Sequence, residues 1–118
     1  MGKETSKRHY LLEANFQMEV LQNPKPTLVE IGADWCGGCE IMAPVLERLA
    51  VVYTDRITFR TIDIEANETL AREYGVSELP FLLLFKNGHL VDHVVGVISA
   101  KELEDRLKNL LMEKENSQ

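Results

Sequence analysis

The spacing of apolar residues predicts helices and strands in alternation along the chain. Four segments have the apolar periodicity of amphipathic helices: residues 13–22, 36–50, 67–74 and 99–112. Five segments have the continuous or alternating apolar pattern of strands: residues 7–12, 27–31, 57–64, 81–85 and 90–95. Because helices separate the first four strands, we expect an α/β fold with parallel βαβ crossovers, in which about four helices flank a central mixed sheet of about five strands.

Local signals mark the ends of several elements. Residues 27–31 form a mostly apolar run, typical of a strand that is covered on both faces. Asn87 and Gly88 predict a tight hairpin that makes the last two strands antiparallel. Ser99 and Glu102 form a capping box at the start of the last helix.

Composition limits the possible classes of protein. The 118 residues are 45% hydrophobic and 27% charged, which predicts a single domain over 1–118 with frayed tails at 1–7 and 113–118. No apolar run approaches the ~18 residues of a membrane span. The net charge of −6 and the lack of a basic stripe argue against nucleic-acid binding. The polar start does not resemble a secretory signal, so we expect a cytoplasmic protein.

The chemistry of the chain is concentrated in the sequence Trp35-Cys36-Gly37-Gly38-Cys39. It contains the only tryptophan and the only two cysteines. The two thiols are three positions apart, so on a helix they lie on one face. In a cytosolic protein such a pair is usually catalytic or metal-binding, and within a strand–helix–strand pattern it indicates a dithiol/disulfide redox centre.

A zinc site is the alternative for this pair, because Cys36 and Cys39 are accompanied by His89 and His93. However, those histidines belong to one predicted strand and would lie roughly 13 Å apart, too far to share one ion. We therefore expect no metal.

Three segments carry a resemblance to a known family. They are Leu28–Cys39 with Ile41-Met42-Ala43-Pro44, Tyr74-Gly75-Val76-x-x-Leu79-Pro80 continuing through Leu82–Gly88, and Val95-Gly96. In these residues and in their spacing, nearly the whole chain resembles the thioredoxin family.

The resemblance implies a thiol–disulfide oxidoreductase that reduces protein disulfides. Cys36 would be the attacking nucleophile, which is physically reasonable because a helix N-terminus stabilises a thiolate. Cys39 would be the resolving thiol. The implied partners are disulfide-containing target proteins and a thioredoxin-reductase-like flavoprotein as electron donor. No cofactor would be bound beyond the redox-active Cys36–Cys39 disulfide, and we expect a monomer.

The resemblance also implies a surface on which targets bind. Pro80 matches the family's cis-proline, which packs beside the disulfide and leaves the Leu79 backbone open to a target strand. The implied substrate-binding residues are Trp35, Gly37, Gly38, Leu79, Pro80 and Gly96.

Glu30 lies in a strand that should be buried, where a carboxylate is unfavourable and its pKa rises. The family has an aspartate here that helps deprotonate the resolving cysteine. By resemblance, Glu30 would transfer a proton to or from Cys39. The alternative is a glutamate at the end of a strand whose carboxylate reaches solvent.

Several residues near the cysteines depart from the family. Gly38 replaces a proline, Gly32 replaces a bulky aromatic residue and so opens space, and Glu40 replaces a basic residue. Because Asp34 and Glu40 flank the thiols, we expect the pKa of Cys36 to be lowered only moderately, as in reducing members of the family.

Three functions are therefore compared. The first is a reductant of protein disulfides. The second is a disulfide oxidase or isomerase with a higher reduction potential. The third is a thioredoxin-fold scaffold that binds a partner without redox chemistry, against which the two intact cysteines and Pro80 argue.

Overall fold

A four-stranded mixed sheet organises the molecule in the computed structural model, which describes residues 13–112. The strands are β1 (Thr27–Gly32), β2 (Thr58–Asp63), β3 (Phe81–Lys86) and β4 (His89–Val95), in the order β2-β1-β3-β4. β1 pairs with β2 in parallel and with β3 antiparallel, and β3 pairs with β4 antiparallel. β1 is therefore hydrogen-bonded on both sides.

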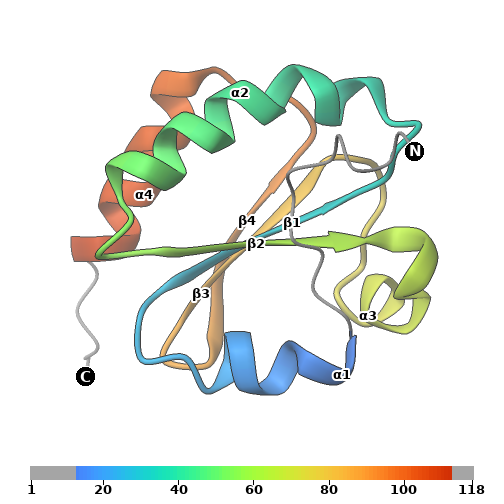
Figure 1. The fold of residues 1–118 in the computed structure, drawn as a ribbon, viewed down its shortest axis with the longest axis horizontal. Coiled ribbons are helices and arrows are strands. Elements are labelled where there is room, and N and C mark those ends of the chain that lie inside the picture. The colour runs from blue at the N-terminus through green and yellow to red at the C-terminus, as the bar shows by residue number, and fades with distance from the viewer. Residues whose placement is uncertain (1–12, 113–118) are drawn as a thin grey trace, which may run out of the picture.

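Helices cover both faces of this sheet (Figure 1). α2 (Gly37–Val52) and α4 (Ala100–Met112) lie on one face. The short α1 (Glu13–Phe16), the π-helical η2 (Gln17–Leu21), the 3₁₀ turn η3 (Ile64–Ala66) and α3 (Glu68–Glu73) complete the set, with α1 and α3 on the other face. The predicted α/β class, with a central mixed sheet flanked by helices, is confirmed.

Two aspects of the predicted sheet need comment. The fifth strand was expected at residues 7–12, which lie outside the described residues. The predicted parallel crossover through the helix at residues 67–74 is wrong, because β3 runs antiparallel to β1. The six-residue α3 rises only about 9 Å. It therefore does not return the chain to the far end of the sheet, and β3 starts where β1 and β2 finish.

Strand β1 is covered on both faces, as its mostly apolar sequence predicted, since all six of its residues are buried. Alternate side chains enter two separate cores. Leu28 packs with residues of α2 and α4, whereas Val29 and Ile31 pack with residues of η2 and α3. Glu30 therefore points to the α2 face.

The helical spacing of Ala14, Met18 and Leu21 predicts Met18 on the inward face of the first helix, and this prediction is wrong. Met18 is 71% exposed, whereas Phe16 and Val20 are buried. The chain winds as a π-helix from Gln17, and the Phe16 ring contacts the rings of Tyr74 and Phe85 with centroids 5.9 and 5.7 Å away. The aromatic contacts determine which face turns inward.

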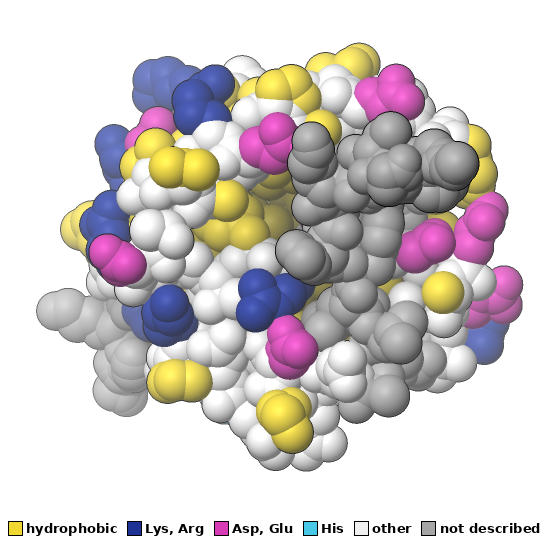
Figure 2. All heavy atoms as spheres, in the orientation of Figure 1, with side chains coloured by type: hydrophobic (Ala, Val, Ile, Leu, Met, Phe, Trp, Pro, Cys, Tyr) yellow, Lys and Arg dark blue, Asp and Glu magenta, His cyan; other side chains and the backbone are white. Residues whose placement is uncertain are grey.

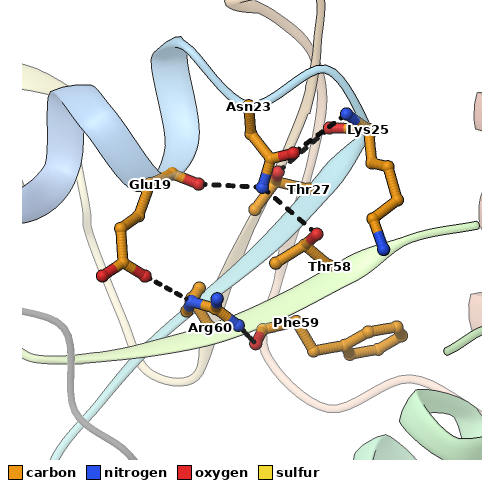
Figure 3. Close-up of polar contacts among 7 residues, drawn as sticks. All are labelled: Glu19, Asn23, Lys25, Thr27, Thr58, Phe59 and Arg60. Carbon is orange, nitrogen blue, oxygen red and sulfur yellow. Dashed lines mark hydrogen bonds and ion pairs between the residues drawn. The ribbon is translucent and has the colours of Figure 1, made fainter. Parts of the chain in front are cut away.

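Polar contacts attach this helical segment to strand β2 (Figure 3). Arg60 forms an ion pair of 2.8 Å with Glu19. The side-chain amide of Asn23 donates to the Glu19 carbonyl and to the Thr58 hydroxyl, at 3.1 and 3.2 Å. These contacts hold the chain at the point where it enters β1.

The predicted turn and cap signals are largely confirmed. Asn87 and Gly88 have φ values of 55° and 80° in the β3–β4 hairpin. The Ser99 hydroxyl accepts a hydrogen bond from the Glu102 amide at 3.0 Å. Asn67 precedes α3 without a side-chain cap hydrogen bond, and its side-chain N–H donates to the Asp63 carbonyl at 3.0 Å.

Candidate functional site

The two cysteines lie where β1 passes into α2. β1 ends at Gly32, and Cys36 is the N-cap residue of α2, with extended backbone angles of −90° and 110°. Cys36 and Cys39 are joined by a disulfide bond, with their Cα atoms 5.2 Å apart. The Cys39 amide donates a hydrogen bond of 3.0 Å to Cys36 Sγ. The first turn of the helix thus presents an N–H group directly to the sulfur of Cys36.

Apolar side chains enclose this disulfide. Cys36 is 6% exposed and Cys39 is 2% exposed. Ala33 is buried with them, and Ile64 and Leu79 pack against the group. The site is therefore dry, and Cys36 is the slightly more accessible of the two sulfurs.

Pro80, which the resemblance placed beside the disulfide, contacts the glycine between the cysteines. The Leu79-Pro80 peptide bond is cis. A Cβ built on Gly38 would lie 2.9 Å from Pro80 Cδ, 3.1 Å from Val97 Cγ2 and 3.5 Å from the Leu79 carbonyl oxygen. The structure thus brings together residues from α2, the α3–β3 loop and the loop after β4.

Gly96 joins the same surface. Its amide donates a hydrogen bond of 2.8 Å to the Pro80 carbonyl, and its φ of 81° favours glycine. A Cβ built there would lie 2.9 Å from a Glu78 carboxylate oxygen. The side chain of Glu78 therefore lies across Gly96, next to the Leu79-Pro80 backbone.

Trp35 projects from the site and is 66% exposed. Its indole N–H donates a hydrogen bond to the carboxylate of Glu65, which follows β2. The sequence had indicated only a solvated loop residue at Glu65. Gly37, the next residue but one, is exposed, and a Cβ there would have no neighbour within 4 Å.

Glu30 is 4% exposed, so the alternative in which its carboxylate reaches solvent is wrong. A Cβ built on Gly32 would lie 2.9 Å from Cys39 Sγ and 3.7 Å from Glu30 Oε2. The space that Gly32 was expected to open is therefore occupied by the disulfide. The structure brings Glu30, Gly32 and Cys39 together beneath the exposed part of the site.

Acidic residues dominate the exposed rim. Asp34 and Glu40 are exposed on either side of the cysteines. Figure 2 shows basic side chains mainly toward the end of the molecule opposite the start of α2, whereas acidic side chains lie at both ends. Asp34 and Glu40 place negative charge next to the cysteines in the chain, as the sequence predicted.

His89 and His93 are not arranged around the cysteines. The ring of His93 stacks on Phe81 with centroids 5.7 Å apart, and His89 is exposed at the start of β4. Within residues 13–112, no group of three or more His, Cys, Asp or Glu side chains is placed to hold a metal ion. Nor does any helix in that range combine the length and hydrophobicity needed to cross a bilayer.

Comparison with known proteins decides the family. The family model described as Thioredoxin matches residues 7–109. The chain belongs to the thioredoxin family. A thioredoxin of Alicyclobacillus acidocaldarius is 38% identical over 101 residues, which cover 86% of this chain and 95% of the relative. A thioredoxin of Porphyra purpurea is 37% identical over 99 residues, covering 84% and 92% of the two chains.

As a thioredoxin-family protein with a disulfide-bonded Cys-x-x-Cys pair, the chain is a thiol–disulfide oxidoreductase that reduces protein disulfides. Sequence analysis missed three neighbours of this site: Glu65, Glu78 and Val97. Glu78 and Val97 directly adjoin predicted site residues, so chain proximity could have identified them. Glu65 gave no signal, because its contact with Trp35 joins segments 30 positions apart.

Proposed function

We propose that Cys36 is the nucleophile of this reductase and Cys39 its resolving thiol. The observation that carries the proposal is the position of Cys36 at the N-cap of α2, where the Cys39 amide donates to its sulfur. The same hydrogen bond and the helix dipole stabilise a thiolate on Cys36 after reduction. Cys39, one turn inside the helix and 2% exposed, is shielded from a second target.

The proposed reaction has two exchange steps. The Cys36 thiolate attacks one sulfur of a target disulfide, forming a mixed disulfide and releasing the other target sulfur as a thiolate that takes a proton from water. Cys39 loses its proton and attacks Cys36 Sγ, and the bond between Cys36 and the target breaks. The target leaves with two thiols, and the protein is left with the Cys36–Cys39 disulfide, so two electrons have moved to the target.

Glu30 is the proposed proton acceptor for Cys39 in the second step. Its burial supports this role, because a buried carboxyl holds a proton more readily than an exposed one. Its proximity also supports it, since Glu30 Oε2 and Cys39 Sγ lie near the same point beside Gly32. Reduction of the disulfide would return the proton along the same short path.

Target proteins are proposed to bind on the surface around the disulfide. Leu79 offers its backbone to an extended target segment, and Trp35 offers an exposed ring. The close packing of Gly38, Pro80 and Gly96 supports one continuous surface. Gly37, which is exposed, leaves the approach to Cys36 open.

The cellular setting is proposed from the same chemistry. A thioredoxin-reductase-like flavoprotein would reduce the Cys36–Cys39 disulfide, and the chain would act in the cytoplasm as a monomer. We also propose that residues 1–118 form one domain, which the two cores on a shared sheet support. The redox-active disulfide is the only redox group that this cycle requires.

Trapping of targets tests the assignment of the two cysteines. The Cys39→Ser variant should accumulate mixed disulfides with a peptide disulfide probe, because the resolving thiol is absent. Cys36→Ser is the matched control and should form none. Equal trapping by both variants, or by neither, would contradict the proposal, and unchanged binding of the probe without any covalent product would favour the scaffold alternative.

A further inference from the structure

Cys39 lies close to strand β1 at Gly32, where the strand has no side chain. The point where a Gly32 Cβ would lie is 2.9 Å from Cys39 Sγ, closer than real Cβ atoms approach a neighbour. In the packing of this chain, a side chain at this position would therefore displace the sulfur or the strand. The displacement is not easily absorbed, because β1 is paired on both sides and Cys39 is 2% exposed.

The same point is also close to Glu30. Glu30 and Gly32 are two positions apart on β1, so they face the same side of the sheet. The Glu30 side chain extends along the strand, and its Oε2 lies 3.7 Å from the Gly32 Cβ position. Cys39 Sγ and the Glu30 carboxyl therefore approach one small space from two directions, and that space exists because position 32 has no side chain.

We propose that Gly32 is a positioning residue for the proton transfer between Cys39 and Glu30. This inference rests on the proposed roles of those two residues. In the resolution step the Cys39 thiol gives its proton to the Glu30 carboxylate, and the resulting thiolate attacks Cys36 Sγ. A methyl group at position 32 would occupy the space that both partners contact, so it would disturb the path of the proton although the nucleophile itself is unchanged.

The Gly32→Ala variant tests this role through the pH dependence of one step. The measured quantity is the rate at which a chromogenic thiol leaves a preformed mixed disulfide on Cys36. We expect Gly32→Ala to lower this rate about tenfold at neutral pH, with the loss recovered as the pH rises. Val29→Ile adds one carbon to the same strand on the opposite face, and it should leave the pH profile unmoved.

A double-variant cycle separates positioning from a general structural effect. In a Glu30→Gln background, where the proton acceptor is gone, Gly32→Ala should slow the step by less than about twofold further. An unshifted pH profile for Gly32→Ala would overturn the inference. So would effects of Gly32→Ala and Glu30→Gln that multiply, because the two residues would then act independently.

Titration of the unmutated side chains provides a test that does not depend on the folding of Gly32→Ala. The Glu30 carboxyl carbon can be followed by NMR in the reduced protein and in Cys39→Ser. Coupled groups show each other's titration, so the reduced protein should give a second step that Cys39→Ser lacks. Identical single-step curves would overturn the inference. If Cys39→Ser still traps targets, the proton-transfer roles of Gly32 and Glu30 are lost, whereas the proposed roles of Cys36 and Cys39 stand.

Discussion

Gly38 packs so closely against Pro80 that a Cβ at position 38 would lie 2.9 Å from Pro80 Cδ. This contact joins the loop between the cysteines to the segment that precedes β3. A glycine in place of the family's proline gives this loop more conformational freedom. The structure shows a second consequence of the glycine, which is that Pro80 and Val97 occupy the space of a side chain.

Gly38→Ala should therefore destabilise the protein. Overpacking of a close contact costs about 1–3 kcal/mol, measured as the free energy of unfolding in urea. Gly37→Ala is the stability control, because a Cβ there meets nothing within 4 Å. Adding Val97→Ala to Gly38→Ala should recover part of the loss, and a Gly38→Ala variant as stable as Gly37→Ala would contradict the packing argument.

The thiol pKa of Cys36 depends on two opposing influences. The Cys39 amide and the helix N-terminus lower the pKa, whereas the negative charges of Asp34 and Glu40 raise it. Glu40→Gln should therefore lower the pKa of Cys36 further, followed in the reduced protein by thiolate absorbance. A rise in that pKa, or no change, would show that the flanking acids do not act on the sulfur.

Tyr53 predicts a loss of stability in alkaline solution. Its hydroxyl donates to Glu104 at 3.0 Å, and burial, followed by this hydrogen bond and the Glu104 charge, raises the pKa of Tyr53 above 10.0. The pKa of Tyr53 is therefore higher in the folded protein than in the unfolded chain. Its contribution to the free energy of unfolding is fully present below about pH 10 and is lost as the pH rises through the folded-state pKa.

Tyr53→Phe provides the check on this alkaline loss. The variant should lose about 0.5–1.5 kcal/mol at neutral pH, because the hydrogen bond is gone. Its stability should then fall less steeply above about pH 10, since one fewer tyrosine titrates there. An equally steep fall in both proteins would assign the alkaline loss to other groups.

The acidic rim should affect the choice of target. Glu78 lies across Gly96 beside the proposed target-binding backbone, and Asp34 and Glu40 flank the cysteines. We expect peptide disulfides flanked by lysines to be reduced faster than those flanked by glutamates, with the difference shrinking at high salt. Glu78→Gln should reduce the difference between the two reduction rates at low salt. If the two rates differ by the same factor in Glu78→Gln and at high salt, this expectation is contradicted.

Much of the fold followed from local pattern. Three elements are specified by nearby residues alone. They are the strand with the mostly apolar run at 27–31, the hairpin with the Asn87-Gly88 turn, and α4 with its leucines. The direction of β3 did not follow, because it depends on the length of the connection through α3. The inward face of the first helix depends on aromatic partners as far away as Phe85.

The site was predictable to the extent that it is contiguous in the sequence or matches family segments. The position of Cys36 at the start of α2 follows from the change of periodicity there. The contacts around Gly32 and Gly38 could not be predicted, because they depend on close approaches between separate elements that no spacing rule describes. The Trp35–Glu65 hydrogen bond is of the same kind.

The reduction potential of the Cys36–Cys39 pair tests the central claim most directly, because it separates a reductant of protein disulfides from an oxidase or isomerase. It can be measured by equilibrating the protein with a dithiol buffer of known potential and quantifying the two forms. We predict a value in the reducing range, nearer the ~−270 mV of thioredoxin than the ~−180 mV of protein disulfide isomerase. A value above about −180 mV would contradict the assignment as a reductase.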